Sequence, residues 1–324
     1  MNKTLIITGA NGYLGHYTVM EAVAQGYDVL ACSFKHFAPV RIDHPAVTYL
    51  ETDISLPADQ QDALSEAVRN RQVVAIIHVA ALLGSSDYAA NEKVNTTGVG
   101  NMMDFARKHA ISRFVFISSV VVLKQIKGPY GVTKLKGQEL LTASAFDYTV
   151  FIPALIMGPE SLGLNRVLKN VFRFPFFVPL IGQGHETQHP VYVKDFAREI
   201  IGAVANEKTK RKVYQIAGDR VIAFRDFIRL ILRHYKKQRI LVPVPVFLAK
   251  ALGMLFQKVQ KVPLFTAEHV KGILQDSHLD IKPLQEDTGY QPTPFEQALE
   301  ASLEVIGKDW NKMLKSRDER VIKI

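Results

Sequence analysis

The sequence of 324 residues contains one cysteine, Cys32, and one tryptophan. A single cysteine excludes an intramolecular disulfide and a cysteine-based metal cluster, and we expect no metal site in this chain. Long apolar runs are also absent. The longest candidate, residues 244–256, is interrupted by Pro245 and Lys250 and is shorter than the ~20 residues that span a bilayer. We expect no stable membrane insertion and interpret this stretch as a substrate-lid helix, with contact at a membrane surface as the alternative.

Aromatic residues do not interleave with the basic clusters 208–212 and 233–239, as they would in a platform that stacks single-stranded nucleic acid. We therefore expect no nucleic-acid partner, although the formal net charge is +9 and the isoelectric point is near 9.4. Steering of an anionic cofactor and substrate is a sufficient use of that charge. No basic leader precedes the first apolar run, so we expect a cytoplasmic protein.

Strand-like runs alternate with helical patterns along the chain, which predicts a parallel sheet with right-handed crossovers. The expected strands lie near residues 3–8, 27–32, 47–50, 73–79, 113–118, 148–152 and 213–217. The expected helices lie near residues 12–25, 60–70, 89–109, 129–145 and 194–206. We predict a doubly wound parallel α/β (Rossmann) sheet in residues 1–156, completed by about 190–217. Residues 157–189, rich in Pro, Phe and Gly, and the mainly helical residues 218–324 are expected to form a smaller substrate-binding domain.

The first expected strand runs directly into Gly9-Ala10-Asn11-Gly12-Tyr13-Leu14-Gly15, and a helical pattern follows. Gly9 permits a tight turn, Gly12 lets the backbone approach a pyrophosphate, and Gly15 lets the helix pack closely on the strand. The helix N-terminus then offers amide donors and a positive dipole end to the phosphates. The spacing is G-x-x-G-x-x-G rather than the commoner G-x-G-x-x-G, but its place between a strand and a helix predicts dinucleotide binding over a plain glycine turn.

A second pattern, Tyr130-Gly131-Val132-Thr133-Lys134, follows Ser118-Ser119. A phenol loses its proton near pH ~10 and is a poor base at neutral pH, but an ammonium four residues later lies one helical turn away and stabilises the phenolate. A nearby serine hydroxyl can hold a substrate hydroxyl or carbonyl in line with the phenol. These groups can move a proton while a nicotinamide moves a hydride, so we expect Ser119, Tyr130 and Lys134 to be catalytic.

Residues 8–15 together with Tyr130-x-x-x-Lys134 resemble the extended short-chain dehydrogenase/reductases, a branch often called NAD-dependent epimerase/dehydratase. The resemblance covers roughly residues 3–300. It implies that Asn95 helps to order the active site, and that Ser119 rather than Ser118 carries the catalytic hydroxyl. It implies cofactor contacts for Gly9, Asn11, Gly12, Tyr13, Leu14, Gly15, Asp53, Ile54, Ala80, Ala81, Tyr130, Lys134, Pro153 and Ile156, and substrate contacts for Ser85 and Ser119. His78, His189 and Asp195 are interpreted as structural, with Asp195 as the cap of the helix that follows it.

Three departures from the family pattern lie on the substrate side. Ile152 stands where arginine is usual before Pro153, and residues 121–124 replace the usual Val-Tyr-Gly continuation. The interval from Ser119 to Tyr130 is also short. These changes weaken a specific sugar-nucleotide assignment more than they weaken cofactor binding.

The choice of cofactor is expected to depend on the end of the second strand, which reads Cys32-Ser33-Phe34-Lys35-His36 and has no acid. A carboxylate at this place accepts the ribose 2′-hydroxyl of NAD and would repel a 2′-phosphate, whereas Ser33, Lys35 and His36 can receive one. We therefore expect NADP, with NAD as the alternative. An ordinary exposed lysine is the other interpretation of Lys35.

Two classes of function remain open. The first is an NAD(P)-dependent oxidoreductase, epimerase or dehydratase that acts on a small molecule or nucleotide sugar. The second is a non-catalytic NAD(P)-binding sensor or assembly protein, because residues 178–184 and 189–193 resemble a branch related to a respiratory-complex accessory subunit. The intact Tyr130 and Lys134 favour the enzyme. A homodimer is also expected, through helices near 89–109 and 129–145 that carry Met102, Met103, Phe105, Leu135 and Leu140.

Overall fold

The computed structural model describes residues 2–34, 42–249, 251 and 275–306. Its centre is a seven-stranded sheet in the order β11-β6-β5-β4-β1-β2-β3, and every pairing in it is parallel. The strands are β1 (Lys3–Thr8), β2 (Asp28–Ser33), β3 (Val47–Glu51), β4 (Gln72–His78), β5 (Arg113–Ile117), β6 (Asp147–Pro153) and β11 (Lys212–Ile216). The predicted doubly wound parallel sheet is therefore confirmed.

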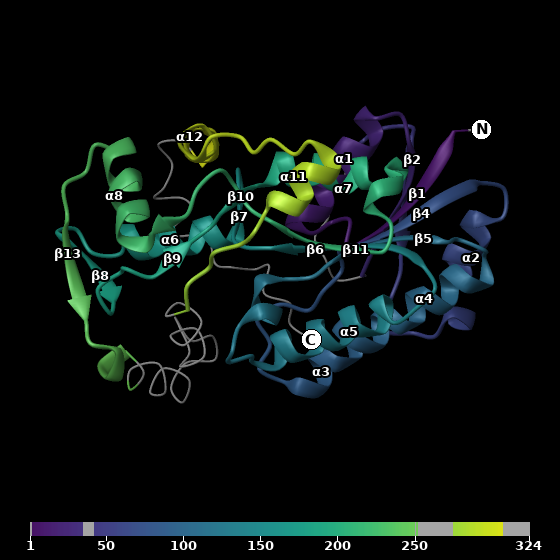
Figure 1. Cartoon of the computed structure of the whole chain (residues 1–324), viewed down its shortest axis with the longest axis horizontal. Coiled ribbons are helices and arrows are strands. Elements are labelled where there is room, and N and C mark those ends of the chain that lie inside the picture. Colours follow the sequence, from purple (N-terminus) through teal and green to yellow (C-terminus); the bar gives the residue numbers. More distant parts are fainter. Residues whose placement is uncertain (1, 35–41, 250, 252–274, 307–324) are drawn as a thin grey trace.

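Helices cover both faces of this sheet (Figure 1). One face packs on α1 (Tyr13–Ala24), α7 (Val193–Ala205) and α11 (Lys282–Thr288). The other packs on α2 (Asp62–Val68), α4 (Gly98–Lys108) and α5 (Pro129–Thr142), and α3 (Tyr88–Glu92) lies against α5. Successive strand residues alternate between the two layers, so that Leu5 and Ile7 lie in the first core and Ile6 in the second.

A third hydrophobic core lies beyond the carboxyl ends of the strands, toward the left in Figure 1. Its elements are α6 (Leu162–Phe172), α8 (Phe224–His234), α12 (Phe295–Ile306), and the short strands β7 (Ile156–Met157), β8 (Phe177–Ile181), β9 (Thr187–Gln188), β10 (Val191–Tyr192), β12 (Ile222–Ala223) and β13 (Ile240–Val244). The strands pair as β7 with β10, β9 with β12, and β8 with β13. We call the part built around this core the second lobe.

The structure corrects several sequence-based expectations. The helix expected near 89–109 is present, but it contains a π-helical turn at Lys93–Thr97 between α3 and α4. The start of the expected lid helix belongs instead to β13; residues 246–249 are helical, and 252–256 lie outside the described residues. Met102, Met103 and Phe105 are fully buried against the sheet, so they cannot supply a dimer surface, whereas Leu140 is exposed. No helix among the described residues is long and apolar enough to cross a membrane.

Candidate active site at the carboxyl ends of the strands

The glycine loop between β1 and α1 is held by its own backbone. Gly9 has a left-handed φ of +67°, and its carbonyl accepts a hydrogen bond from the amide of Gly12 at 2.9 Å. A Cβ on Gly15 would lie 2.0 Å from the Gly9 carbonyl oxygen, and one on Gly9 would lie 2.8 Å from the backbone of Ala80. Gly9 and Gly15 are therefore required for packing, as the sequence predicted for Gly15.

Gly12 has a different role. Its φ of −74° and ψ of 169° are open to any residue, and its Cβ would meet only the Gly9 carbonyl oxygen, at 3.1 Å. It is the N-cap of α1, where no side chain caps the helix and no acid lies in the first turn. The free amides and the helix dipole there fit an anion such as a dinucleotide diphosphate, and Gly12 leaves room for its approach.

Within the same loop, Asn11 and Tyr13 contact other parts of the fold. The Asn11 side-chain amide donates to the Ser33 hydroxyl at 2.8 Å, at the end of β2. The Tyr13 ring packs edge-on against Tyr17, and a Cβ on Gly158 would lie 2.5 Å from the Tyr13 hydroxyl. Tyr13 thus joins the loop to the segment that enters the second lobe, and burial raises the pKa of its phenol.

The ends of β1 and β4 are joined by two polar side chains. The Thr8 hydroxyl accepts from the amide of Ala80 at 3.3 Å and lies 3.2 Å from Nδ1 of His78. His78 is fully buried, its ring stacks on Phe116, and Nε2 has no partner among the described residues. Burial, with a smaller contribution from Lys134, lowers the pKa of His78 to about 3. Thr8 fixes the segment that carries Ala80 and Ala81, a role that the sequence analysis missed.

The buried neutral His78 predicts acid sensitivity. A histidine in the unfolded chain is protonated below pH ~6.5, whereas His78 in the folded chain stays neutral down to about pH 3. Because the unfolded state binds this proton and the folded state does not, the free energy of unfolding should fall as the pH falls from ~6.5 to about 3. The loss approaches ~1.4 kcal/mol for each pH unit. Urea denaturation at several pH values should show a shallower pH dependence for His78→Asn than for the unaltered chain. Parallel curves for the two proteins would contradict this assignment.

Asn95 connects three segments behind the site. Its Oδ1 accepts from the amide of Leu82 at 2.8 Å, and its Nδ2 donates to the Leu82 carbonyl at 3.2 Å and the Thr133 hydroxyl at 3.3 Å. It lies in the π-helical turn, and a Cβ on Gly137 would lie 2.4 Å from its backbone carbonyl oxygen. The glycine one turn after Lys134 therefore lets α5 approach this turn closely. Asn95 thus holds Leu82 and Thr133 in place, and Gly137 allows the close approach of α5.

The two serines after β5 point to different surroundings. The Ser118 hydroxyl is buried and donates to Oε1 of Gln138 on α5 at 2.7 Å. Ser119 is only half-buried, and its Oγ accepts from the amide of Val121 at 3.5 Å. Tyr130 lies in the first turn of α5, near enough to Ser119 for the serine hydroxyl to affect its titration. Burial raises the pKa of Tyr130 to about 12, and the Ser119 hydroxyl moderates this rise.

Lys134 lies one turn after Tyr130 and is 1% exposed. Its Nζ donates to the Ile117 carbonyl at 2.6 Å and lies 4.1 Å from the centre of the Phe116 ring. No carboxylate is among these contacts, and burial lowers the pKa of Lys134 to about 7. A lysine with this environment titrates near neutral pH, where a functional group is most useful.

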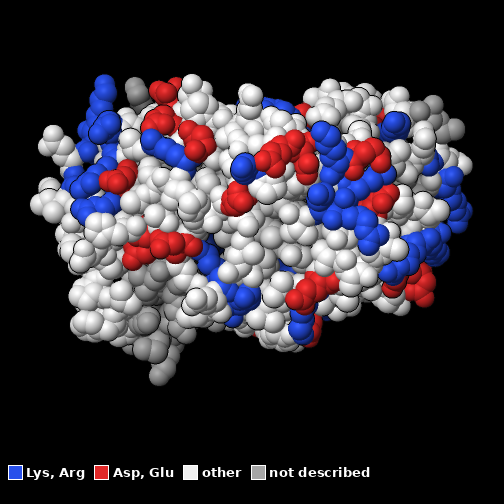
Figure 2. Space-filling model, in the orientation of Figure 1, with Lys and Arg blue, Asp and Glu red and all other residues white. Residues whose placement is uncertain are grey.

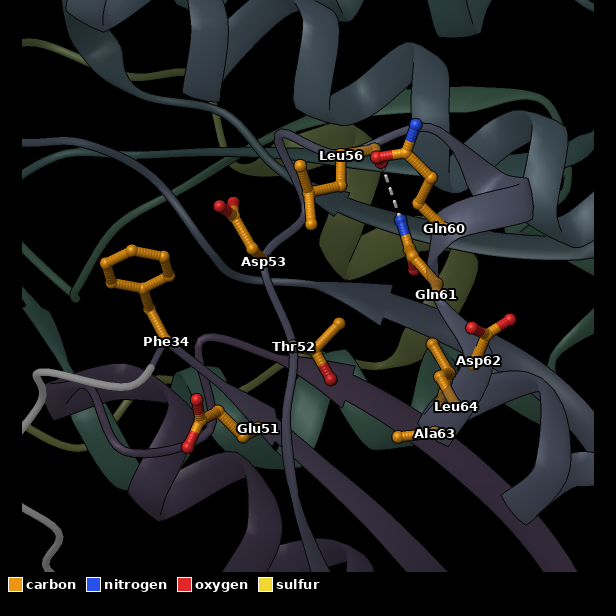
Figure 3. A pocket seen from close by; sticks show the side chains of 10 residues that line it. All are labelled: Phe34, Glu51, Thr52, Asp53, Leu56, Gln60, Gln61, Asp62, Ala63 and Leu64. Atoms are coloured by element: carbon orange, nitrogen blue, oxygen red, sulfur yellow. Dashed lines mark hydrogen bonds between the residues drawn. The ribbon is translucent and has the colours of Figure 1, made fainter.

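A pocket of about 270 Å³ lies at the far end of the candidate cofactor path, where β2 and β3 end (Figure 3). Its lining includes Phe34, Glu51 and Asp53, and the Asp53 carboxylate accepts from the amide of Ser55 at 2.9 Å. The adjacent Ile54 is buried against Gly98 of α4. Neither Ser119 nor Tyr130 lines this pocket, so it fits the adenosine end of a dinucleotide rather than the reacting end. Lys35 and His36 lie outside the described residues.

Other candidate residues are placed around these groups. Pro153 ends β6, and Ile156 begins β7. The Ser161 hydroxyl donates to the Ile156 carbonyl at 2.7 Å. The Ser85 hydroxyl accepts from the amide of Asp87 at 3.2 Å, and no hydrogen bond joins Ser85 to Ser119 or Tyr130. The printed hydrogen bond of the Ser85 hydroxyl therefore lies within its own turn, and a contact of Ser85 with a substrate stays a prediction.

His189 and Asp195, both interpreted as structural, form hydrogen bonds with other segments of the fold, but those of Asp195 differ from the prediction. His189 contacts the Gly218 carbonyl at 3.1 Å through Nε2 and accepts from the amide of Leu279. The prediction that Asp195 caps a helix was wrong, because α7 begins two residues earlier, at Val193. The buried Asp195 instead accepts from the amide and hydroxyl of Thr293, at 2.7 and 2.9 Å, and ties α7 to the approach to α12.

The loop that departs from the family pattern is tied to a distant segment. Nζ of Lys124 donates to the carbonyls of Gln275 and Asp276 and to the Ser277 hydroxyl. The Asp276 carboxylate in turn accepts from the amide and hydroxyl of Thr187. Lys124 therefore connects the loop after Ser119 with the β9 strand of the second lobe.

Comparison with known proteins places this arrangement in a family. Residues 5–217 match the model of the NAD dependent epimerase/dehydratase family. Among curated proteins, the chain is 25% identical over 300 residues to the mitochondrial NADH dehydrogenase [ubiquinone] 1 alpha subcomplex subunit 9 of Mus musculus, covering 90% of this chain and 77% of that protein. It is 22% identical over 335 residues to UDP-glucose 4-epimerase of Vibrio cholerae, covering 94% and 97%.

Solved structures show the same fold at low identity. UDP-glucose 4-epimerase of Thermotoga maritima with UDP-glucose has a TM-score of 0.75 and 18% identity, covering 94% of this chain and 99% of that one. dTDP-glucose 4,6-dehydratase of Bacillus anthracis with NAD has a TM-score of 0.74 and 16% identity, covering 97% and 100%. With the family model matched over most of the parallel sheet and its glycine loop, the chain belongs to the NAD dependent epimerase/dehydratase family.

Proposed function

We propose that the chain is an enzyme that transfers a hydride between a bound dinucleotide and a hydroxyl- or keto-bearing carbon of a small molecule. The observation that carries the proposal is that Lys134 is buried one helical turn after Tyr130, with its Nζ held by the Ile117 carbonyl at 2.6 Å and Ser119 near the phenol. A bound nicotinamide supplies the hydride acceptor or donor. Nucleotide sugars are the proposed substrate class, because the Vibrio cholerae and Thermotoga maritima relatives are UDP-glucose 4-epimerases.

The proton chemistry follows from the environment of each group. Burial keeps the Tyr130 phenol protonated at neutral pH, so it donates a proton to a substrate carbonyl oxygen that becomes a hydroxyl. In the reverse direction the phenol must give up its own proton first, and a protonated Lys134 favours that phenolate. With a pKa of about 7, Lys134 supplies both charged and neutral forms near neutral pH. Ser119 holds the substrate oxygen in line with the phenol.

A second candidate function is non-catalytic dinucleotide binding in a larger assembly. It is favoured by the 25% identity over 90% of this chain to a protein named as a subunit of NADH dehydrogenase. Ile152 and the Lys124 loop, which depart from the family pattern near the substrate side, also fit it. The combination of Ser119, Tyr130 and the buried Lys134 favours catalysis, because binding a dinucleotide alone does not require a serine hydroxyl near a phenol.

A product assay tests the two candidates. Purified protein is incubated with NADH or NADPH and a panel of ketones, and with NAD⁺ or NADP⁺ and a panel of alcohols, while nicotinamide absorbance is followed. UDP-glucose and dTDP-glucose are incubated with NAD⁺ or NADP⁺ in parallel, and the products are separated by chromatography, since an epimerase returns the hydride and leaves absorbance unchanged. Turnover in either assay supports the enzyme; tight cofactor binding without any product would favour the assembly candidate.

For the cofactor, we expect NADPH to bind more tightly than NADH. Ser33 ends β2 without a carboxylate and is bonded to Asn11, which leaves a hydroxyl and an amide at the place of the ribose. Lys35→Glu should erase or reverse the difference, because it replaces a cation that follows β2 in the sequence with a carboxylate, which repels a 2′-phosphate. The check is to measure both dissociation constants by fluorescence titration, with Lys212→Glu on the opposite edge strand as the control. Equal dissociation constants for NADPH and NADH, unchanged in Lys35→Glu, would contradict the predicted preference for NADPH.

We further propose that residues 157–189 and 218–324 form the substrate-binding part of the chain. The third hydrophobic core supports this, because its described members come from these two segments, apart from half-buried neighbours such as Leu155 and Tyr192. A homodimer through α5 also stays a proposal, with the exposed Leu140 as its remaining apolar contact.

A further inference from the structure

The outward face of the two-stranded sheet β8–β13 is apolar along its whole length. The inward residues Val178, Leu180 and Leu241 belong to or pack against the third hydrophobic core. By alternation the opposite face consists of Phe177, Pro179, Ile181, Ile240, Val242 and Val244, which face one another in register. Phe177, Ile240 and Val242 are exposed, and Ile240 is 72% exposed. A parallel pair is normally buried on both faces, so this outward face is unusual for a free protein.

Two neighbouring aromatic residues extend this surface. Phe176 precedes β8 and is 78% exposed, and Phe247 follows β13 and is 76% exposed. Leu248 beside Phe247 is also exposed. We call the β8–β13 face with Phe176, Phe247 and Leu248 the apolar end of the second lobe. Contiguous exposed apolar surface of this kind marks an interaction site on a soluble fold.

The charge of the same region is one-sided. Residues 161–185 and 227–249, which contain β8 and β13, have eight Lys and Arg and no Asp or Glu. The rest of the chain has 32 Lys and Arg against 31 Asp and Glu, so most of the basic excess of the protein comes from these two segments. Arg233, Lys236 and Lys237 are exposed at the end of α8 and just before β13. Figure 2 shows Lys and Arg side chains at this end of the molecule, beside an uncharged surface where Figure 1 places β13.

We propose that the apolar end of the second lobe docks on an anionic lipid bilayer surface. Exposed aromatic and aliphatic side chains enter the headgroup boundary, while the lysines and arginines around them contact anionic headgroups. This is peripheral contact and needs no spanning helix. A protein partner would be expected to present acids to an acid-free basic surface in a fixed pattern, whereas a bilayer presents diffuse negative charge, which matches basic residues spread over two segments.

Vesicle cosedimentation of the full chain tests the proposal. The chain should bind phosphatidylcholine vesicles that contain phosphatidylglycerol at least about tenfold more strongly than pure phosphatidylcholine vesicles, and added salt should weaken the binding. The double variant Phe176→Ser/Phe247→Ser should lose at least about tenfold of this binding, because both rings would leave the lipid boundary. Met20→Ser, which alters a 47% exposed side chain on α1, is the matched control and should bind like the unaltered chain.

The charge contribution is tested in the same assay. Lys236→Gln/Lys237→Gln should weaken binding to anionic vesicles, and Lys208→Gln/Lys212→Gln should not. Thermal unfolding and dinucleotide binding are measured for every variant to show that the fold is retained. No preference for anionic vesicles, or equal loss in Met20→Ser, overturns the proposal. Two further outcomes would overturn the proposal. If the chain binds no vesicles but self-associates, and Phe176→Ser/Phe247→Ser abolishes the self-association, the surface belongs to a contact with a second copy. If the chain binds DNA but no vesicles, the charge of the surface serves nucleic acid.

Discussion

Tyr130→Phe is expected to lower turnover by a factor of about 10²–10⁴ on a confirmed substrate, the usual contribution of a positioned acid–base group. The dissociation constant of the dinucleotide should barely change, because the ring and its packing remain. Tyr235→Phe is the matched control, since the Tyr235 hydroxyl has no hydrogen-bond partner among the described residues and lies in the second lobe. Steady-state kinetics and a cofactor titration on the two variants make the comparison.

Variants of Ser119 and Lys134 should differ from each other in the same two measurements, turnover and cofactor affinity. Ser119→Ala should lower turnover and leave cofactor affinity intact, because its hydroxyl meets the phenol and the substrate. Lys134→Met should damage both, since the ammonium serves the phenol and is proposed to hold the nicotinamide ribose. Full activity of Tyr130→Phe would show that the proposed proton donor is wrong.

Gly12→Val is expected to weaken dinucleotide binding by at least about 100-fold while the fold is retained, since the backbone at Gly12 suits any residue. The valine methyl groups would occupy the space above the α1 N-terminus that a diphosphate needs. Gly202→Val is the control, because a Cβ at Gly202 meets nothing within 4 Å. Calorimetric titration gives the affinities, and thermal unfolding checks the fold.

Gly15→Ala should behave differently from Gly12→Val. Its Cβ would lie 2.0 Å from the Gly9 carbonyl oxygen, so the loop or the helix must move and the thermal midpoint should fall together with binding. Unchanged cofactor affinity in Gly12→Val would mean that the glycine loop does not hold the phosphates.

The main sheet could be predicted from the sequence because each of its strands carries a local signal. Runs such as Leu5-Ile6-Ile7 are long enough and apolar enough to be recognised without knowledge of their partners, and every predicted boundary lies within one residue of the observed one. In a parallel sheet the functional residues gather at the strand ends, so Gly9 could be predicted from its place after a strand, whereas Ala80 and the choice of Ser119 over Ser118 were predicted from the family resemblance.

The second lobe could not be predicted in the same way. β8 and β13 each contain a proline, Pro179 and Pro243, which argues against a strand locally, and they pair across about sixty residues of sequence. The error on Asp195 has a similar cause. Its partner Thr293 lies 98 residues away, and no local pattern distinguishes such a contact from a helix cap.

We propose that Tyr130 moves a proton at a site where the glycine loop holds the dinucleotide. The decisive experiment is a side-by-side measurement of turnover and cofactor affinity for the unaltered chain, Tyr130→Phe and Gly12→Val. We expect Tyr130→Phe to lose turnover and keep cofactor affinity, whereas Gly12→Val should lose both. Equal turnover in the unaltered chain and Tyr130→Phe, with cofactor still bound, would contradict it.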